Sequence, residues 1–419
     1  MQKLIIKGQK ELSGKISISG SKNATLPILA ASILGKKVIV KNIPLVKDIF
    51  TMIELLNFIG LKTKLIKKDN IIEINNSDKK INTLAPYKLV KTMRAGVLVL
   101  GSLLTKYKKA KVSLPGGCAI GTRPVDLHLF ALKKLGAKIK IKDGYIFAEA
   151  KNGLKGAKIR FPSISVGATE NALIAAFKAK GRTILKNCAI EPEIKDLISF
   201  LKKLGASITL KGRTISIREN EIKSSKIIHQ VIFDRIELGT YMIASALLAK
   251  KDILINKINP KIIKSEIEIL KKIGVKIIKN KKSIIIKKSF RLKKINIITK
   301  PYPGFPTDLQ AQLMVLLTQA NGISKIKENI FENRFMHVPE LKRMGAQIEI
   351  KDKTAIIKGP AKLTGAEVMA TDLRASVSLV LAGLIAENRT IINRIYHLDR
   401  GYEFLERKLK NCKAEIKRV

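Results

Sequence analysis

One pattern of hydrophobic and polar positions recurs along the whole chain. The segment 132–141, LKKLGAKIKI, combines the end of an amphipathic helix, a glycine that ends the helix, and a strand in which apolar and polar residues alternate. Similar segments follow at regular intervals, and Lys413 replaces the glycine in the last of them. The copies lie at 55–65, 132–141, 201–210, 270–279, 341–350 and 409–419, with spacings of 76, 69, 69, 71 and 68 residues.

A second helix is predicted ahead of each copy. Its segments are rich in Ala, Leu, Ile and Val on all sides, which indicates that these helices are buried. A short strand and a loop then connect each buried helix to the amphipathic one. The predicted buried helices span 22–34, 91–104, 165–179, 234–249, 306–320 and 371–386.

These segments predict six βαβ-like units of about 70 residues each. A unit of this size buries little core by itself, so we expect the units to pack in threes. That grouping divides the 419-residue chain near residues 231–233 into two similar α/β domains. The first 20 or so residues are expected to form a strand-like segment ahead of the first buried helix.

Unusual polar residues collect at the start of the buried helices and in the loops after the short strands. If the units are alike, these places share one edge of each domain, where free N–H groups and the positive end of the helix dipole suit phosphates. Two such edges facing each other would form an anion-binding cleft. The residues concerned are Lys22, Asn23, Arg94, 165–167, Asp234, Arg235, Asp308 and Arg374 at the helix starts, and 116–126, 332–334 and 399–401 in the loops.

Each of these residues also has a purely structural interpretation. A Lys or Arg near a helix start is often only solvated. Asp234 and Asp308 suit a helix start because carboxylates are favoured there, and Ser165 suits an N-cap. The recurrence across the units argues against this interpretation for the set, but not for any single member.

The loop 115–128, PGGCAIGTRPVDLH, carries the sharpest chemical signal. Its glycines make a segment that is able to approach a ligand, and Cys118 lies among them, five residues before Arg123. A thiol with a pKa near ~8.5 is mostly protonated at neutral pH and can donate a proton, whereas a thiolate beside cations can attack as a nucleophile. Cys188 and Cys412 are instead expected to be buried as small apolar residues.

The net charge changes this interpretation little. The chain has 81 Lys and Arg against 33 Asp and Glu, which gives a formal charge of +48. The lysines are spread along the chain together with many Ile and Asn, as a bias at the coding level would produce. Aromatic residues make up 5%, which is too few for base stacking. We therefore expect small anionic substrates and no nucleic-acid partner.

The positions of the cysteines and histidines argue against a disulfide-bonded protein and against a metal site. Three distant cysteines form no disulfide framework, and the four histidines lie too far apart for a metal site. Neither a phosphate loop nor a dinucleotide fingerprint is present, so no cofactor is expected. The start of the chain lacks a signal peptide, and the apolar runs fall short of the ~20 residues that span a bilayer. We expect a soluble, cytoplasmic protein without a membrane partner.

Seven segments, in order along the chain, resemble the UDP-N-acetylglucosamine 1-carboxyvinyltransferase family, the UDP-GlcNAc enolpyruvyl transferases. The sister family that makes 5-enolpyruvylshikimate 3-phosphate shares the six-unit plan but lacks the cysteine of the glycine loop, so PGGC separates the two. The seven segments are GSKNATLPILAASIL (20–34), PGGCAIGTRPVDLH (115–128), SVGATEN (165–171), YPGFPTDLQAQ (302–312), FENRFMHVPEL (331–341), ATDLRAS (370–376) and HLDRGYE (397–403).

The resemblance implies an enzyme of peptidoglycan synthesis. Its reaction transfers the enolpyruvyl group of phosphoenolpyruvate to the 3-hydroxyl of UDP-N-acetylglucosamine and releases phosphate, without a cofactor or a metal. It also implies an inside-out α/β barrel pair in which two domains close over both substrates. The first domain would cover 22–232, and the second would combine 1–21 with 233–419.

The resemblance further assigns roles to residues. Cys118 matches the cysteine that protonates the enolpyruvate methylene and can form a covalent adduct, and Asp308 matches the proposed base for the sugar hydroxyl. Arg334, Asp372 and Arg374 match cleft positions of less certain role. The phosphoenolpyruvate site would comprise Lys22, Asn23, Arg123 and Arg400. The UDP-GlcNAc site would comprise Asn23, Arg94, Arg123, Pro124, Val125, Asp126, Leu127, Ser165, Val166, Gly167, Asp308 and Ile330.

One departure from the family pattern is visible. Ser163 stands where some relatives have a lysine that contacts the diphosphate, which puts one charge contact in doubt but not the activity.

Two rival classes of protein make different predictions. A basic nucleic-acid-binding repeat protein would bind any duplex, and its affinity would fall steeply as the salt concentration rises. A non-catalytic nucleotide-sugar sensor would bind UDP-GlcNAc without releasing phosphate.

Overall fold

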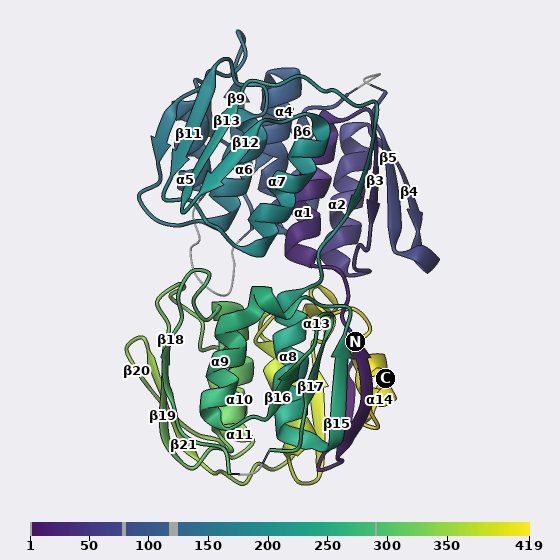
Figure 1. Cartoon of the computed structure of the whole chain (residues 1–419), viewed down its shortest axis with the longest axis vertical. Helices are drawn as coiled ribbons and strands as arrows, with labels where there is room; N and C mark the ends of the chain where they lie inside the picture. Colours follow the sequence, from purple (N-terminus) through teal and green to yellow (C-terminus); the bar gives the residue numbers. More distant parts are fainter. Residues whose placement is uncertain (1, 78–80, 117–124, 290) are drawn as a thin grey trace. The chain divides into compact units, whose positions relative to one another are not determined.

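The computed structural model describes residues 2–77, 81–116, 125–289 and 291–419. Within these residues the chain divides into two compact units, each with its own hydrophobic core (Figure 1). The unit from Gly20 to Ile232 is called the Lys22 unit below. The unit that contains the residues up to Ser19 and those from Phe233 to Val419 is called the Asp308 unit.

The Lys22 unit contains three buried helices, three outer helices and three sheets. The buried helices are α1 (Lys22–Ala31, continued by η1, Ser32–Leu34), α4 (Val99–Tyr107, preceded by η3, Arg94–Leu98) and α6 (Val166–Ala176). The outer helices are α2 (Lys47–Ile59), α5 (Asp126–Lys134) and α7 (Pro192–Leu204), and η2 (Lys67–Asp69) and α3 (Tyr87–Val90) are short. The strands are β3 (Lys37–Lys41), β4 (Lys62–Ile66), β5 (Ile71–Asn75), β6 (Leu84–Ala85), β7 (Lys109–Ser113), β8 (Lys138–Lys142), β9 (Tyr145–Glu149), β10 (Lys158–Arg160), β11 (Arg182–Lys186), β12 (Ile208–Lys211), β13 (Thr214–Arg218) and β14 (Lys226–Gln230).

The Asp308 unit repeats this plan. Its buried helices are α8 (Arg235–Leu248), α10 (Gln310–Leu317, preceded by η5, Thr307–Leu309) and α12 (Ser376–Ile385). Its other helices are η4 (Pro260–Ile263), α9 (Lys264–Ile273), α11 (Val338–Arg343), α13 (Tyr396–Asp399) and α14 (Leu405–Asn411). Its strands are β1 (Leu4–Lys7), β2 (Leu12–Ser17), β15 (Ala249–Asn256), β16 (Ile277–Lys279), β17 (Ser283–Ile286), β18 (Asn296–Ile298), β19 (Gly322–Lys327), β20 (Gln347–Lys351), β21 (Thr354–Gly359), β22 (Glu367–Met369), β23 (Arg389–Asn393) and β24 (Glu415–Arg418).

Each of the six sheets has four strands of mixed direction. In the order β14-β3-β5-β4, β3 pairs parallel with β14, and β5 pairs antiparallel with both β3 and β4. The strands β3 and β4 are therefore parallel to each other, with β5 between them and α2 as the crossover. The α/β fold with six repeated units, predicted from the sequence, is confirmed.

The first two strands of the chain complete sheets of the Asp308 unit. Strand β2 pairs parallel with β15, and β1 lies between β23 and β24, antiparallel to both. In the sheet of β23, β1 occupies the place that the return strand of a hairpin occupies in the other units. The expected strand-like segment at the start of the chain is thus two strands in two different sheets.

The sequence prediction missed the return strand of each hairpin, namely β5, β9, β13, β17 and β21. The alternating pattern simply continues after a tight turn, as at Asp143 and Gly144 between β8 and β9, where both residues have positive φ. An Asp-Gly pair flanked by alternating residues favours a hairpin, so the signal was present in the sequence.

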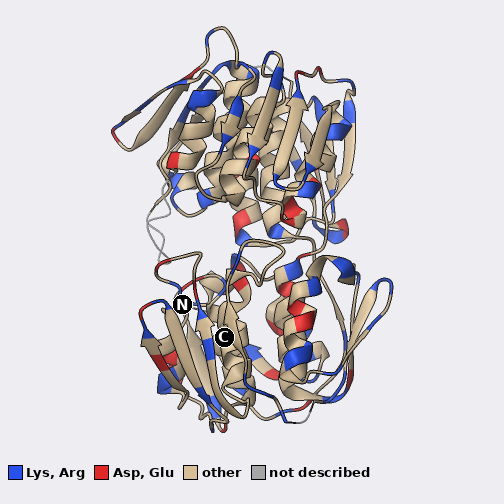
Figure 2. Cartoon of the chain, turned by 60° about the vertical axis from the view of Figure 1, so that its left-hand side comes forward, with Lys and Arg blue, Asp and Glu red and all other residues tan. Residues whose placement is uncertain are grey.

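Helices occupy the interior of each unit, and strands lie outside them (Figure 1). Strand β3, KVIVK, shows how the alternation sorts side chains: Val38 and Val40 are buried, whereas Lys37 and Lys41 are exposed. Repetition of this pattern places Lys and Arg on many separate strands and outer helices (Figure 2). Among the described residues, no helix has both the length and the hydropathy needed to cross a membrane.

Candidate active site

Five alternating charges meet at the helix starts of the Asp308 unit. Arg374 Nη2 lies 3.4 Å from Oδ2 of Asp234, and Arg374 Nε lies 3.8 Å from Oδ2 of Asp308. Arg334 Nη2 lies 2.6 Å from Oδ1 of Asp308, and Arg334 Nη1 lies 3.9 Å from Oδ2 of Asp372. The side chain of Asp308 is 26% exposed, whereas the other four are at most 10% exposed. Asp308 is therefore the member of this five-charge chain that a ligand can reach.

The helix-cap interpretation explains two of these carboxylates. Asp234 is the N-cap of α8 and accepts hydrogen bonds from two N–H groups of its first turn. Asp372 accepts from two consecutive N–H groups just ahead of α12. Asp308 lies inside η5, where Pro306 occupies the N-cap position. Asp234 is thus a helix cap, whereas Asp308 is a carboxylate in the first turn of η5, a position that also fits the helix-start interpretation.

Glu328, which the sequence did not single out, ties two parts of this site together. Its Oε2 accepts a hydrogen bond from Thr307 Oγ1 at 2.9 Å, and its Oε1 accepts from the N–H of Ile330 at 2.8 Å. Glu328 is buried, and these bonds compensate for its loss of water. It therefore holds the loop of Ile330 and Arg334 next to η5, which carries Asp308. A single carboxylate after a strand has no spacing that would have revealed this role.

Arg374 is fixed from several sides. Its guanidinium lies 5.2 Å from the ring centroid of Tyr402 and donates to the carbonyl of Gly401 at 3.3 Å. Burial opposes the charge on Arg374, but Asp234, Tyr402 and Asp308 outweigh burial and raise the pKa of the guanidinium. Arg374 is consequently a permanent, oriented cation.

A neutral histidine lies near Arg334 and Asp372, at one end of the five-charge chain. His337 is fully buried, and burial lowers its pKa to about 4 although Asp372 acts in the opposite direction. The charge of Arg334 also lowers this pKa, whereas a hydrogen bond with the backbone of Arg334 raises it. At neutral pH His337 is therefore uncharged and adds no second cation beside Arg334.

Arg400, assigned to phosphoenolpyruvate, lies at the end of α13 and is half-buried. The preceding residue, Asp399, is held by both Nη atoms of Arg418, at 2.7 and 3.1 Å. Arg418 belongs to β24, so the last strand anchors the turn that carries Arg400. The sequence gave no signal for this long-range pair, because Arg418 lies at the end of an ordinary alternating strand.

In the Lys22 unit, Lys22 begins α1 and is buried. Its Nζ lies 3.0 Å from Oδ2 of Asp48, in the first turn of α2. Ser21 caps α1 by accepting from the N–H of Ala24 at 3.2 Å, and Asn23 follows Lys22 on the half-buried first turn. The lysine assigned to phosphoenolpyruvate is thus a paired cation at a helix start.

Other described positions of this unit that the resemblance assigns to the nucleotide sugar also lie at helix starts. Arg94 is the first residue of η3 and is half-buried. Ser165 caps α6 by accepting from the N–H of Ala168 at 3.3 Å, which confirms its N-cap interpretation. Val166 and Gly167 are the first two residues of α6, ahead of its first intrahelical hydrogen bond, so their N–H groups face outward. Ser163 is exposed on the preceding loop.

Part of the glycine loop lies outside the described residues. Cys118, Arg123 and Pro124 belong to this part, so their predicted roles stay predictions. Val125 is the N-cap residue of α5, Asp126 begins that helix in an exposed position, and Leu127 follows it.

The other two cysteines are structural. Both Cys188 and Cys412 are buried and free. Burial raises the pKa of Cys188 to about 12 and that of Cys412 to about 11. They therefore remain protonated thiols within packed cores, and their predicted role as small apolar residues is confirmed.

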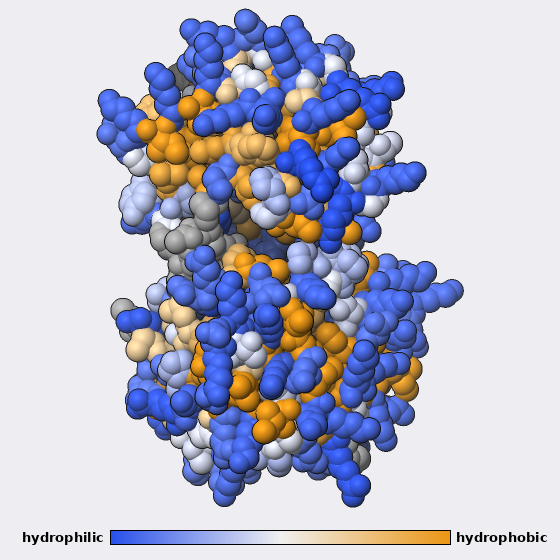
Figure 3. Space-filling model, turned by 90° about the vertical axis from the view of Figure 1, so that its left-hand side faces the viewer, coloured by the Kyte–Doolittle hydropathy of each residue, from blue (hydrophilic) through white to orange (hydrophobic). Residues whose placement is uncertain are grey.

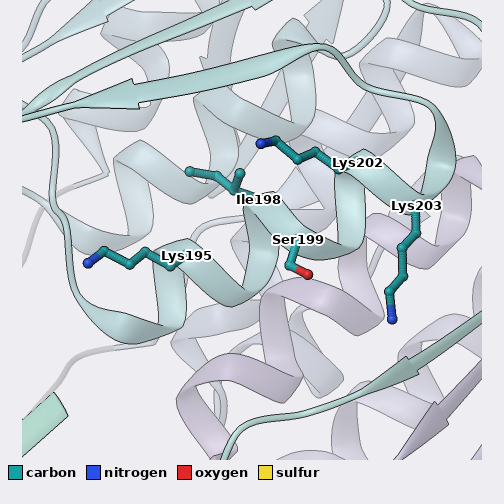
Figure 4. A pocket seen from close by; sticks show the side chains of 5 residues that line it. All are labelled: Lys195, Ile198, Ser199, Lys202 and Lys203. Carbon is teal, nitrogen blue, oxygen red and sulfur yellow. The ribbon is translucent and has the colours of Figure 1, made fainter. Parts of the chain in front are cut away.

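Two surface hollows lie away from these helix starts. One, of about 470 Å³, is lined by Lys195, Ile198, Ser199, Lys202 and Lys203 of α7, and its lysines point in different directions (Figure 4). The other, of about 880 Å³, lies beside α9 and the β16–β17 hairpin. Hydrophilic side chains also cover much of both units on the face in Figure 3. Within the described part of the chain, no three His, Cys, Asp or Glu side chains form a metal-binding group.

Comparison with known proteins places this geometry in context. A family model described as EPSP synthase (3-phosphoshikimate 1-carboxyvinyltransferase) matches residues 6–409. UDP-N-acetylglucosamine 1-carboxyvinyltransferase from Pelagibacter ubique (strain HTCC1062) is 59% identical over 422 residues and covers 100% of both chains. The protein of the same name from Endomicrobium trichonymphae is 51% identical, over 100% of this chain and 99% of its own. The crystal structure of the enolpyruvyl transferase NikO from Streptomyces tendae has the same fold, with a TM-score of 0.89 at 24% identity over 100% of this chain and 99% of NikO.

Proposed function

Since the chain belongs to the UDP-N-acetylglucosamine 1-carboxyvinyltransferase family, we propose that it transfers the enolpyruvyl group of phosphoenolpyruvate to the 3-hydroxyl of UDP-N-acetylglucosamine and releases phosphate. The observation that carries this proposal is the 59% identity over the full length. The retained PGGC loop favours this reaction over that of the sister family. The product enters peptidoglycan synthesis, and we place the reaction in the cytoplasm.

The proposed reaction is an addition followed by an elimination. An acid protonates C3 of phosphoenolpyruvate, C2 becomes electrophilic, and the sugar oxygen attacks C2 while its proton passes to a base. The resulting tetrahedral ketal then loses a proton from C3 and expels phosphate from C2, which restores the double bond. We assign the acid to Cys118 and the base to Asp308. Each such group is typically worth about 10²–10⁴ in rate.

The five-charge chain supports Asp308 as the base. Arg334 Nη2 lies 2.6 Å from Oδ1 of Asp308, and Arg374 Nε lies 3.8 Å from Oδ2. The two arginines orient the carboxylate, and burial of both arginines keeps that orientation fixed.

The anionic groups need cations and N–H donors. We assign the phosphate and carboxylate of phosphoenolpyruvate to Lys22, Asn23, Arg123 and Arg400. The nucleotide sugar would use Arg94, the loop 123–127, the start of α6 at 165–167, and Ile330. Helix starts supply N–H groups and the positive end of the dipole, which suits both a phosphate and a diphosphate.

Phosphate release tests the proposal directly. Purified protein is incubated with both substrates and with each one omitted in turn, and free phosphate is measured. We expect release only with both substrates, and no release when shikimate 3-phosphate replaces UDP-N-acetylglucosamine. Binding of UDP-N-acetylglucosamine without phosphate release would instead support the sensor class. Salt-dependent duplex binding with no release would support the nucleic-acid class.

The variant Cys118→Ser tests the acid. A serine hydroxyl is a far weaker acid than a thiol, so we expect turnover to fall by about 10² or more while UDP-N-acetylglucosamine binding is retained. Cys118→Asp is the matched control, because a carboxyl group can still supply a proton; it should retain activity with a lower pH optimum. Normal turnover of Cys118→Ser would remove Cys118 from the acid role.

A further inference from the structure

A buried amide has its orientation fixed by two backbone groups where α4 and α6 of the Lys22 unit pack together (Figure 1). Asn171 Oδ1 accepts from the N–H of Gly101 at 2.8 Å, and Asn171 Nδ2 donates to the carbonyl of Val97 at 3.2 Å. An N–H can only donate and a carbonyl can only accept, so these two bonds determine which side-chain atom is nitrogen.

This orientation determines the proton position on His128 of α5. Asn171 Nδ2 also lies 3.1 Å from His128 Nδ1. Because an amide NH₂ only donates, Nδ1 must accept, and the neutral ring carries its proton on Nε2. The ring is neutral because it is buried: burial lowers the pKa of His128 to about 3, and the charge of Arg94 acts in the same direction.

The edge of the ring that carries Nε2 lies beside Gly167, at the start of α6. A Cβ placed on Gly167 would lie 3.1 Å from Cε1 and 3.2 Å from Nε2 of His128, so the ring fills the space beside that glycine. Within the described part of the chain, Nε2 has no recorded hydrogen-bond partner. A donor on a side chain that is only 4% exposed thus lies next to the outward N–H groups of Val166 and Gly167.

We propose that His128 is a nucleotide-sugar-binding residue whose neutral Nε2–H donates to a diphosphate oxygen, and that Asn171 is the positioning residue that sets its tautomer. The inference rests on the proposed function, since it specifies how the start of α6 recognises the diphosphate. A neutral donor adds a hydrogen bond where Ser163 supplies no charge. Its binding contribution is also independent of pH across the neutral range.

Two substitutions at His128 separate the donor from the ring. The amide nitrogen of Gln lies near the position of Nε2, whereas that of Asn lies near Nδ1, so His128→Gln retains the donor and His128→Asn removes it. We expect His128→Asn to weaken UDP-N-acetylglucosamine binding by about 10- to 150-fold, as for a hydrogen bond to a charged group. His128→Gln should stay within about fivefold of the unmodified protein. Uridine, which lacks the diphosphate, should bind all three proteins equally, and equal loss in both variants or an equal loss for uridine would overturn the inference.

The unmodified protein separates this inference from the proposed function. If it neither binds UDP-N-acetylglucosamine nor releases phosphate, the proposed function fails. If it does both and His128→Asn binds as tightly, only the role of His128 fails.

The variant Asn171→Asp tests the tautomer. A carboxylate beside Nδ1 draws the proton to that nitrogen and leaves a lone pair on Nε2 at neutral pH; at lower pH the ring carries both protons, because the carboxylate now opposes Arg94. UDP-N-acetylglucosamine affinity should then fall at least about tenfold between pH 6 and pH 8, whereas that of the unmodified protein varies less than about twofold for this cause. A thermal melt shows whether the variant folds, and the His128 pair tests the inference if it does not. A folded variant whose affinity is independent of pH would contradict the role of Asn171.

Discussion

The helix starts of the two units are built in different ways. In the Asp308 unit, ionised side chains bind one another in the chain Asp234, Arg374, Asp308, Arg334 and Asp372. In the Lys22 unit, the start of α6 presents backbone N–H groups beside the neutral His128. The Asp308 unit also keeps Asp234, Asp308 and Asp372 next to arginines, whereas the Lys22 unit has Glu170, whose pKa is raised well above its usual value by burial, Glu193 and Glu191.

The difference separates two tasks. A network of ion pairs holds each charge in a fixed orientation, which suits a carboxylate that must accept one proton in one direction. Neutral donors need no counter-ion and lose nothing to a competing carboxylate, which suits the binding of a diphosphate. The comparison predicts that removal of an arginine from the five-charge chain destabilises the Asp308 unit and that neutralisation of Glu170 stabilises the Lys22 unit.

The largest effect is expected from Arg374→Met. The substitution leaves Asp234 buried without its arginine, and breaking one side of a buried pair typically costs about 3–5 kcal/mol. For a unit of this size that lowers the melting temperature by roughly 6–20 °C. Lys351→Met is the matched control, because Lys351 pairs with Glu349 on the exposed surface and should change stability by less than about 0.5 kcal/mol. Equal melting temperatures for both variants would mean that the five-charge chain does not hold the Asp308 unit together.

Asp308→Asn is expected to lower turnover by at least about 10² with a nearly unchanged melting temperature. Stability is retained because Arg374 still forms its ion pair with Asp234, and Arg334 still forms its ion pair with Asp372. Phosphate release and a thermal melt measure the two quantities on one sample. Near-normal turnover together with a clearly lower melting temperature would return Asp308 to a structural role, and the base would lie elsewhere.

The smallest effect is expected from Glu170→Gln, and its sign is opposite. Burial, Glu193 and Glu191 raise the pKa of Glu170 in the folded protein, so above the ordinary pKa of about 4.5 the unfolded chain binds fewer protons than the folded protein. The stability contribution of this group is therefore complete below about pH 4.5 and is lost as pH rises toward the raised pKa. Glutamine resembles the protonated carboxyl and avoids that loss, so the variant should have a higher melting temperature than the unmodified protein at pH 8.

A melt at pH 4 supplies the control for Glu170→Gln, because the two proteins should differ little there. The exposed Glu149 gives a second control, since Glu149→Gln should change neither melting temperature. A lower melting temperature of Glu170→Gln at pH 8 would show that the folded protein needs the charge of Glu170, and the contrast between the units would then fail.

The repeated pattern was sufficient to predict the fold and most helix starts. The predicted helix at 22–34 corresponds to α1 and η1, because apolar residues continue on all sides through Leu34. The predicted start at 371 is wrong by five residues, because residues 373–375 form a turn, in which the side chain of Asp372 accepts the N–H groups of Arg374 and Ala375, and α12 begins only at Ser376. Patterns of hydrophobicity do not register such a local turn.

The ion pairs and hydrogen bonds within the site could not be predicted from the sequence. The pairs Lys22–Asp48 and Asp308–Arg334 each join residues 26 positions apart on separate elements, and no periodicity links them. Similarly, the tautomer of His128 depends on Asn171, which depends in turn on two backbone groups of another repeat. The resemblance to a family identified residues, but only the packed structure shows which of them are bound to one another.

The pairing of β1 sets an order on synthesis at the ribosome. Leu4 and Ile6 emerge well before β23 and β24, the strands that enclose them. At roughly 5–20 residues per second, these apolar side chains wait about 20–80 s for their partners. Every strand of the Lys22 unit is available by residue 230, so that unit can close while the nascent chain still exposes its first strand. Strand β1 is therefore open to chaperones and proteases during translation, although Leu4 and Ile6 are buried in the finished protein.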